Sequence, residues 1–399
     1  MKVLLGVTGG IAAYKAAEIT RALVKRGDEV RVVMSAGARE FITPLTFQVL
    51  SGNPVGTEIF DPNYESEIGH IELARWADVV LVAPATANFI ARLCAGMSDD
   101  LLTTVLLATR APVVIAPAMN TQMWGHVFVQ RNIAMLAEHP GYHVVDPDSG
   151  ELACKEVGAG RLPDPEVVLE ALDRARAPQL LAGHRVLISA GPTREAIDPA
   201  RFLSNPSTGK MGFALARVAH RMGARVTLVA GPTTLRAPAG VESIPVNTAR
   251  EMHSAITTRA ESMDIVVMAA AVADWRPKIV NDSKQTKSSI SPTLELEANP
   301  DILAELGARF GGSDASGPLL VGFAAESDYI KERGLAKMQR KQAHMLVANK
   351  IGGPDSAFGA DSSSVVILTA ESSMEVGPAT KEELATRILQ VAAAIQKSR

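Results

Sequence analysis

Residues 148–195 read DSGELACKEVGAGRLPDPEVVLEALDRARAPQLLAGHRVLISAGPTRE, and this stretch decides how the chain is organised. Its first part places Cys154 in a glycine-rich loop. Its middle part has a helical pattern and ends in residues 175–183, which combine Ala, Pro, Gln and Leu. Its last part opens a new apolar run at 186–188 that breaks into a Gly-Pro-Thr turn. The first half of the chain therefore ends with a candidate reactive thiol, and the second half begins with a βα unit of the kind that binds nucleotides.

The composition favours an α/β enzyme of small molecules. A chain of 399 residues exceeds one ordinary core, so two or three domains are expected. Its 47% apolar and 4% aromatic content suits buried parallel strands rich in Val, Ile, Leu and Ala. The net charge of −3 gives no support to binding of nucleic acid or another polyanion.

The cysteines and the first residues indicate a soluble protein of a reducing compartment, so we expect a cytoplasmic location. Cys94 and Cys154 are the two cysteines, which implies no disulfide framework. The apolar start of the chain is broken at residues 8–10 and leads into a helical pattern, which predicts a first strand and no signal peptide. Since no run of 18 apolar residues exists, no membrane span is expected.

Apolar runs alternate with amphipathic segments along both halves. Strands are expected at 3–7, 30–34, 79–83, 113–116 and 143–145, and in the second half at 186–190, 225–230, 265–270, 319–323, 345–348 and 365–368. Helices are expected at 11–26, 210–222 and 381–397. This alternation predicts two doubly wound, Rossmann-like domains built on parallel sheets.

The domain prediction assigns residues 1–175 and 185–399 to the two domains and residues 176–184 to a linker. Residues 278–296 are polar and poor in aromatics, which predicts a mobile loop or flap. Surface loops are expected at 311–317 and 352–364.

Gly9 and Gly10 stand between the first strand and the first helix, where small residues let a phosphate reach the helix N-terminus. A tight turn without a ligand is the alternative. Ser35, after the second strand, could donate a further hydrogen bond to a phosphate or act as an ordinary helix cap.

Polar clusters follow two further strands, as APATAN at 83–88 and APAMNTQMW at 116–124. Ligands of open parallel sheets bind beyond the carboxyl ends of the strands. Asn88 and Asn120 offer amide groups there. Met119, Met123 and Trp124 offer an apolar wall, although each methionine alone could belong to the core.

Six motifs of the first half together resemble the flavin-dependent cysteine decarboxylase family: GVTGGIAAYK, GHIELARWAD, APATAN, AGMSDDL, PAMNTQMW and ACKEVGAGRL. The resemblance implies a flavodoxin-like domain with His70 as the catalytic histidine, Asn120 holding the substrate carboxylate and Cys154 as proton donor. It also implies that FMN is lined by Gly10, Ile11, Ala12, Ser35, Thr86 and Asn88. Lys155 departs from the family, in which a glycine usually follows the cysteine.

The chemistry of that family explains these residue types. A C-terminal cysteine amide has no sink for the electrons that remain when CO2 leaves. Oxidation of the CH2–S⁻ group to a thioaldehyde supplies the sink, and return of the electrons makes the reaction redox-neutral, as suits a flavin. His70 would then be the base and Cys154 would protonate the enethiolate.

The second half carries GPTRE at 191–195 and SNPSTGKMG at 204–212. The latter lacks the GxxxxGK[ST] spacing of a P-loop, but hydroxyls and N–H groups at a helix start still make a phosphate cradle. With AAAVADWRP at 269–277, NPDI at 299–302 and GFAAE at 322–326, the set resembles phosphopantothenate–cysteine ligases. The fused arrangement resembles the bifunctional coenzyme A biosynthesis enzymes of bacteria.

That resemblance implies amide formation driven by CTP and Mg2+. The 4′-phosphopantothenate carboxylate attacks the α-phosphate to give an acyl-cytidylate and pyrophosphate, and the cysteine amine displaces CMP. Arg201 and Asn205 would serve the acyl-cytidylate, and Lys284 would be the flap lysine, a role that Lys287 could share. The implied CTP contacts are Asp274, Lys284, Pro300, Asp301, Ile302, Leu303, Phe323, Lys337 and Lys341. The metal ligands are not identified by the sequence.

The family also implies a homo-oligomer with trimeric and dimeric contacts, up to a dodecamer. Three alternatives stay open from the sequence. A two-domain NAD(P)-dependent oxidoreductase is disfavoured because no GxGxxG with a later acidic residue is present. A non-catalytic flavoprotein and a decarboxylase of peptide cysteines keep the fold and change the role.

Overall fold

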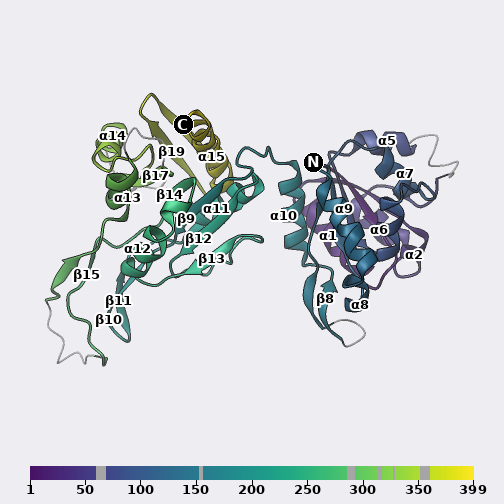
Figure 1. Ribbon diagram of the computed structural model, residues 1–399, viewed down its shortest axis with the longest axis horizontal. Coiled ribbons are helices and arrows are strands. Elements are labelled where there is room, and N and C mark those ends of the chain that lie inside the picture. The colour runs from purple at the N-terminus through teal and green to yellow at the C-terminus, as the bar shows by residue number, and fades with distance from the viewer. Residues whose placement is uncertain (60–68, 152–155, 285–292, 312–316, 327–328, 351–359) are drawn as a thin grey trace. The chain divides into compact units, whose positions relative to one another are not determined.

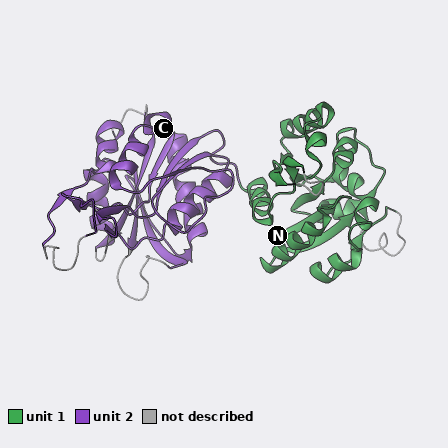
Figure 2. Cartoon of the chain, turned by 90° about the horizontal axis from the view of Figure 1, so that it is seen from below, with its two compact units in different colours: residues 1–177 green, residues 178–399 purple. Residues whose placement is uncertain are grey.

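The computed structural model describes residues 1–59, 69–151, 156–284, 293–311, 317–326, 329–350 and 360–399. Contacts divide the chain into two compact units, Met1–Ala177 and Pro178–Arg399, which Figure 2 colours separately. Residues 176–184, the predicted linker, include Leu181, whose side chain is fully buried in the core of the second unit. No helix of the described segments is both long and apolar enough to cross a membrane.

The first unit is built on a six-stranded sheet with the order β3-β2-β1-β4-β5-β6. All neighbouring strands run parallel, as predicted. Its elements are β1 (Lys2–Val7), α1 (Ala13–Lys25), β2 (Glu29–Met34), α2 (Ala36–Arg39), α3 (Pro44–Ser51), β3 (Val55–Gly56), α5 (His70–Trp76), β4 (Val79–Ala85), α6 (Ala87–Cys94), α7 (Leu101–Ala108), β5 (Val113–Pro117), α8 (Thr121–Trp124), α9 (Val127–Glu138), β6 (Tyr142–Val144), β7 (Asp148–Glu151), β8 (Val157–Arg161) and α10 (Pro165–Arg176).

The side chains of alternate strand residues pack into two separate cores, one on each face of this sheet. Val3 and Leu5 pack with residues of α1, α3 and α10, whereas Leu4 packs with residues of α5, α6 and α7. This is the two-residue period of a strand that is buried on both faces. The order of strands reverses direction at β1, which lies between β2 and β4. Ligand sites of open α/β sheets lie at such a switch point.

The second unit has an eight-stranded sheet with the order β13-β12-β9-β14-β17-β18-β19-β20. Its elements are β9 (Arg185–Ala190), β10 (Arg194–Asp198), β11 (Arg201–Ser204), α11 (Lys210–Arg221), β12 (Arg225–Ala230), β13 (Glu242–Pro245), α12 (Ala249–Thr257), η1 (Ala260–Ser262), β14 (Ile265–Met268), β15 (Trp275–Pro277), β16 (Leu296–Ala298), α13 (Ile302–Phe310), β17 (Leu319–Glu326), α14 (Ile330–Arg340), β18 (Met345–Lys350), β19 (Ser362–Thr369), β20 (Ser373–Thr380) and α15 (Lys381–Ser398). The strands from β13 to β18 are parallel, and β19 and β20 continue the sheet antiparallel.

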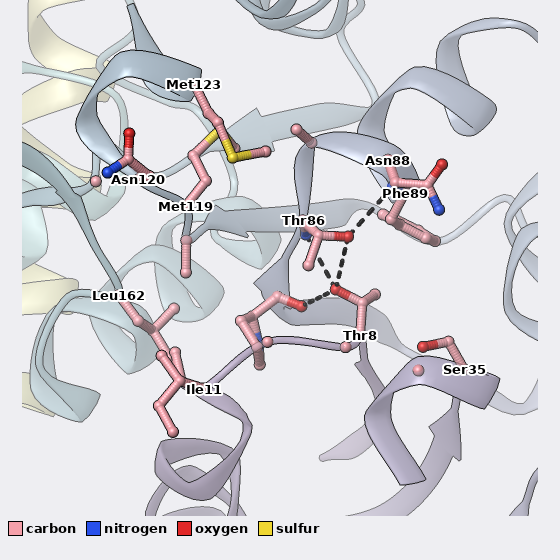
Figure 3. Close-up of a pocket in the computed structure, with 18 of the residues that line it drawn as sticks. Thr8, Ile11, Ser35, Thr86, Asn88, Phe89, Met119, Asn120, Met123 and Leu162 are labelled. Atoms are coloured by element: carbon pink, nitrogen blue, oxygen red, sulfur yellow. Dashed lines mark hydrogen bonds between the residues drawn. The ribbon is translucent and has the colours of Figure 1, made fainter. Parts of the chain in front are cut away.

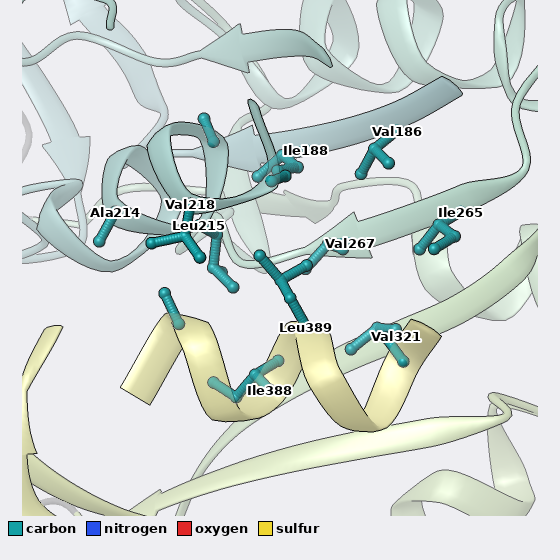
Figure 4. Close-up of a cluster of buried hydrophobic side chains, with 14 of the residues drawn as sticks. Val186, Ile188, Ala214, Leu215, Val218, Ile265, Val267, Val321, Ile388 and Leu389 are labelled. Atoms are coloured by element: carbon teal, nitrogen blue, oxygen red, sulfur yellow. The ribbon is translucent and has the colours of Figure 1, made fainter. Parts of the chain in front are cut away.

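The helices α11 and α15 cover one face of the second sheet. Ile388 and Leu389 of α15 point toward the strand residues Ile188 and Val267 in a fully buried cluster (Figure 4). The other face is covered by α12 and α13. A capping box at Thr380 and Glu383 fixes the start of α15, because each side chain accepts a hydrogen bond from an N–H group at this helix end.

Two antiparallel ribbons of the second unit were not predicted from the sequence. They are β10–β11 and β15–β16, and Figure 1 shows them extending away from the eight-stranded sheet. The N–H of Asn281 donates to the carbonyl of Ile197 at 3.0 Å and joins the connection after β15 to β10. Residues 352–359 of the predicted surface loop 352–364 lie outside the described residues. The prediction is wrong at its end, because residues 362–364 already belong to β19, which pairs with β20.

Candidate active sites

The loops at the carboxyl ends of β1, β2, β4 and β5 surround a cavity of about 1380 Å³. Figure 3 shows side chains from these loops and from the segment after β8 facing it. The cavity is lined by Thr8, Gly9, Gly10, Ile11, Ala12, Tyr14, Lys15, Ser35, Ala36, Gly37, Pro84, Thr86, Ala87, Asn88, Phe89, Arg92, Asp99, Asp100, Ala118, Met119, Asn120, Met123, Glu151, Gly160, Arg161 and Leu162. All six residues that were predicted to line FMN are among them.

Hydroxyl groups connect the turns on either side of this cavity. The Oγ1 of Thr8 donates to the carbonyl of Pro84 at 2.8 Å and accepts from the N–H of Thr86 at 3.0 Å. The side chains of Ser35 and Thr86 also cap α2 and α6, accepting N–H groups at 3.3 Å. Ser35 is therefore a helix cap, as one of its two interpretations predicted, and it also lines the cavity, while its hydrogen bond to a phosphate stays a prediction.

The turn after β1 is kept narrow by Gly9. A Cβ atom on Gly9 would lie 2.6 Å from the backbone carbon of Gly37. Such a separation is too short for any side chain, so the two loops can approach this closely only with glycine at position 9. The turn thus exposes backbone groups to the cavity, as phosphate binding requires.

The hairpin β7–β8 docks on the loop that carries Asn120. The carbonyl of Gly160 accepts the N–H of Met119 at 2.9 Å, and a Cβ atom on Gly160, whose φ is +142°, would lie 2.3 Å from the Met119 carbonyl oxygen. Asn120 caps α8 with its Oδ1 and donates from its Nδ2 to Glu156 Oε2 at 2.6 Å. Cys154, predicted as the proton donor, lies outside the described residues.

His70 and Trp124 are not among the residues that line the cavity. His70 is the first residue of α5, and Figure 1 shows α5 at the opposite end of the first unit from α8 and β8. Of the predicted apolar wall, Met119 and Met123 face the cavity.

Charged residues at this cavity were missed by the sequence reasoning. The guanidinium of Arg92 lies 2.7 Å from an oxygen of Asp99 and 2.7 Å from an oxygen of Asp100. Burial alone would raise the pKa of Asp100, but hydrogen bonds from Thr103 and Arg92 outweigh it and hold this pKa below its usual range. The motif AGMSDDL was the available signal, since it places two carboxylates directly before α7.

A smaller cavity, of about 140 Å³, lies in the second unit at the carboxyl ends of its central strands. It is lined by Ser207, Thr208, Gly209, Lys210, Met211, Gly212, Ala269, Ala270, Ala271, Phe323, Ala324, Ala325, Asn349 and Lys381. Phe323 is the one predicted CTP contact in this set. The start of α11 forms one side of the cavity, and its N-cap is Gly209, with a left-handed φ of 80°.

Other predicted CTP contacts gather around the start of α13. Asp301 caps α13 by accepting the N–H of Ala304 at 3.1 Å and is ion-paired with Lys341. Burial lowers the pKa of Lys341, and the charge of nearby Asp274 offsets part of this effect. Pro300 directly precedes Asp301.

The remaining predicted contacts differ in their surroundings. Ile302 and Leu303 are buried in the core beside the second sheet, so only their backbone is in a position to meet a ligand. Lys337 lies one turn before Lys341 on α14 and is half-buried. Lys284 is exposed in the connection between β15 and β16, and Lys287 lies outside the described residues.

Asn205 and Arg201, predicted to serve the acyl-cytidylate, make different contacts. The Nδ2 of Asn205 donates to the carbonyls of Ala271 and Val272 at 3.2 and 3.1 Å, which holds it beside the smaller cavity. Arg201 Nε donates to the buried carboxylate of Asp198 at 3.0 Å, within the β10–β11 ribbon. Among the described residues, no group of three or more His, Cys, Asp or Glu side chains gathers to hold a metal ion.

Two family models match consecutive parts of the chain. The flavoprotein family model matches residues 1–176. The model of the DNA/pantothenate metabolism flavoprotein C-terminal domain matches residues 181–395. Residues 177–180, between the two matches, include the division between the two compact units.

Similar proteins cover nearly the whole chain. The coenzyme A biosynthesis bifunctional protein CoaBC of Vibrio cholerae is 47% identical over 392 residues, which is 98% of this chain and 97% of that protein. The protein of the same name from Bacillus subtilis is 46% identical over 400 residues, covering 99% and 97%. That of Escherichia coli is 42% identical over 392 residues, covering 97% and 95%.

Solved structures resemble each half. The crystal structure of the C-terminal domain of a coenzyme A biosynthesis bifunctional protein CoaBC is 38% identical with a TM-score of 0.47, covering 55% of this chain and 100% of that chain. A PPC decarboxylase mutant complexed with pantothenoylaminoethenethiol is 30% identical with a TM-score of 0.37, covering 42% of this chain and 93% of that chain.

Proposed function

Because the chain belongs to the family of bifunctional coenzyme A biosynthesis proteins, we propose that it makes 4′-phosphopantetheine in two steps. The unit 178–399 ligates 4′-phosphopantothenate to cysteine, and the unit 1–177 decarboxylates the resulting 4′-phosphopantothenoylcysteine. The protein is thus a flavoprotein and an enzyme whose substrates are small molecules. The observation that carries the proposal is the cavity of the first unit, because it gathers all six predicted FMN-lining residues with Asn120.

The large cavity fits a flavin mononucleotide. Its volume of about 1380 Å³ accommodates a cofactor together with part of a substrate. Gly9 and Gly10 have no side chains, so the backbone N–H groups of the turn after β1 are accessible from the cavity. The hydroxyls of Ser35 and Thr86 line the same cavity, and together these groups would bind a phosphate. Bound FMN supplies reversible two-electron oxidation of the substrate's cysteinyl side chain.

The chain's own residues orient the substrate and move protons. The amide of Asn120 would bind the substrate carboxylate, which leaves as CO2. Cys154 would donate the proton to the α-carbon. Its place in the chain lies between β7 and β8, and Glu156, which follows shortly after it, is bonded to Asn120. His70 is proposed as the base on the resemblance alone, since it is not among the residues that line the cavity.

For the ligation we propose CTP as the co-substrate, bound from the smaller cavity toward the start of α13. Asp274, Lys337 and Lys341, with Phe323 and residues 300–303, would contact the nucleotide. Asn205, held beside the cavity, and Arg201 would serve the acyl-cytidylate, and Lys284 would neutralise developing phosphate charge. Mg2+ would be bound mainly through the triphosphate, as is usual for this ion. A carboxylate is a poor acyl donor. Its conversion to the acyl-cytidylate provides CMP as a good leaving group for attack by the cysteine amine.

Mass spectrometry of the products tests this proposal. Purified protein is incubated with 4′-phosphopantothenate, cysteine, CTP and Mg2+, and the expected product is 4′-phosphopantetheine. Accumulation of 4′-phosphopantothenoylcysteine would establish the ligase activity. It would also mean that decarboxylation fails, and flavin content and the role of Cys154 would then be measured. If neither compound forms with flavin bound and the protein folded, the proposal is wrong at the level of the substrate.

Two variants separate the activities. Cys154→Ser should leave pyrophosphate release intact and stall decarboxylation after the oxidation step. Lys284→Gln should abolish CTP-dependent pyrophosphate release, whereas supplied 4′-phosphopantothenoylcysteine is still decarboxylated. We also propose a cytoplasmic homo-oligomer, up to a dodecamer, which light scattering of the full chain measures directly.

A further inference from the structure

Lys381 is a buried lysine in the wall of the smaller cavity. It is the first residue of α15, and only 9% of its surface is exposed. Its Nζ donates to the Oγ of Ser363 at 2.7 Å, which fixes the position of the amine. Lys210, at the start of α11, lines the same cavity and pairs with the exposed carboxylate of Asp361 at 2.6 Å.

Three features of this position oppose a positive charge. Burial deprives the ammonium of water, and burial is also the main reason why the pKa of Lys381 is lowered. The ammonium of Lys210 repels it, and Asp361 compensates only in part. The first turn of a helix favours anions, as its other side chains Glu382 and Glu383 illustrate.

A bound anion would offset this electrostatic cost, because its negative charge would lie close to the ammonium of Lys381. The opposite wall of the cavity is the start of α11, a helix of 12 residues whose free N–H groups favour a negative charge. Ser207 and Thr208 add hydroxyl donors at this wall. Two lysines, a helix start and two hydroxyls around about 140 Å³ have the chemistry of a phosphate subsite.

We propose that Lys381 contacts a phosphate group of a ligase substrate, as a binding residue beyond those that the sequence indicated. The inference rests on the proposed ligase function. The phosphate belongs either to the nucleotide or to 4′-phosphopantothenate, and the cavity recognises what the two share. In the free protein the Lys381 amine is held by Ser363, and a bound phosphate would add a negative charge beside it.

The test compares Lys381→Met with wild type in the full-length, flavin-loaded protein. Methionine has nearly the length of lysine and suits a buried site, so the cavity wall is kept and the charge is lost. Pyrophosphate release gives KM values for CTP and for 4′-phosphopantothenate separately. Lys397→Met, at the exposed far end of the same helix, is the matched control.

The expected result is a rise of tenfold to about a hundredfold in one KM, since a charge-assisted hydrogen bond is lost. A rise for CTP assigns the subsite to the nucleotide, and a rise for 4′-phosphopantothenate assigns it to the acyl substrate. In the ligand-free state, Lys381→Met should unfold at a higher temperature than wild type, because a buried charge is removed. If Lys381 were only structural, its replacement would not both raise the unfolding temperature and weaken substrate binding. Lys381→Arg should restore part of the affinity.

Unchanged KM values for both substrates in Lys381→Met would overturn the inference while leaving the ligase function intact. If the wild type releases no pyrophosphate, the proposed function fails, and calorimetric titration with CTP and with 4′-phosphopantothenate then decides on Lys381 alone. Equal binding of both compounds by wild type and by Lys381→Met contradicts the subsite. If the methionine variant does not fold, Lys381→Gln, which can still hydrogen-bond to Ser363, is measured in the same way.

Discussion

The Nδ2 of Asn120 donates to Oε2 of Glu156 at 2.6 Å, so a carboxylate of the protein occupies the amide that is proposed to bind the substrate carboxylate. Asn120 is the N-cap of α8, and Glu156 directly precedes β8. A substrate carboxylate and Glu156 therefore compete for one donor and repel each other.

Replacement of Glu156 by glutamine should lower the KM for 4′-phosphopantothenoylcysteine in the decarboxylation by roughly three- to tenfold. The reason is that the substrate no longer displaces a charge-assisted hydrogen bond at an exposed site. Steady-state kinetics of CO2 release measures this, and Glu138→Gln at the exposed end of α9 is the control. A higher KM would mean that Glu156 positions Asn120 and does not compete with the substrate.

Gly160→Ala should uncouple the hairpin from the loop at Met119. The new Cβ would lie 2.3 Å from a carbonyl oxygen, and alanine at a φ of +142° is strained, so a cost of about 1–3 kcal/mol is expected. Decarboxylation should fall at least tenfold, with pyrophosphate release unchanged. Gly125→Ala, where a Cβ meets only ordinary contacts at 3.6 Å, should be active. Full decarboxylation by Gly160→Ala would show that docking of the hairpin is unnecessary.

Asp301 and Lys341 form an ion pair that nucleotide binding would have to rearrange. Lys341→Met should raise the KM for CTP by about tenfold, because a charge facing the phosphates is lost. Asp301→Asn keeps the cap of α13, since asparagine also accepts the Ala304 N–H, and should leave that KM equal or lower. Lys331→Met, on the same helix, controls for loss of a lysine. Parallel effects of the two changes at the ion pair would contradict a role for Lys341 in binding CTP.

His344 should make the folded second unit less stable in mild acid. Its Nδ1 accepts the N–H of Leu320 at 2.9 Å, and burial, with a smaller effect of Arg399, lowers the pKa of His344 to about 4. In the unfolded chain the pKa returns to about 6.5, so the unfolded state binds the proton first. The free energy of unfolding is therefore highest above about pH 6.5 and falls as the pH drops toward 4.

His344→Asn should flatten this dependence, since the asparagine oxygen can accept the same N–H without taking up a proton. Urea unfolding at pH 7, 6 and 5 gives the comparison, and His139→Asn, at an exposed site, controls for loss of a histidine. An unchanged slope between pH 7 and 5 would show that His344 is not the group responsible.

The central strands were predictable because they depend on local apolar patterns, whereas the FMN-lining set was implied by the resemblance to flavin-dependent decarboxylases. Buried parallel strands read as apolar runs, and the residues that follow them meet at one edge of the sheet whatever the details of packing. Gly10, Ser35 and Thr86, distant in sequence, line one cavity in the structure.

Contacts between segments far apart in sequence were not predictable in the same way. Lys381 reaches the start of α11 only because β19 and α15 fold back onto the second sheet, and nothing near residue 381 in the sequence marks a cavity. The β10–β11 and β15–β16 ribbons were missed because short exposed strands lack an apolar period. The bond between Asn120 and Glu156 depends on the docking of a hairpin, which spacing alone does not reveal.

The division of the chain between Ala177 and Pro178 leaves each core complete: α10 belongs to the first, and Leu181 to the second. A gene split at this point would encode two polypeptides that each keep a full sheet and its cavity. Joining them in one chain fixes their ratio at one to one and keeps the supplier of the intermediate within tether length of its consumer. The covalent link thus sets the stoichiometry and the local concentration of two units that each have a core of their own.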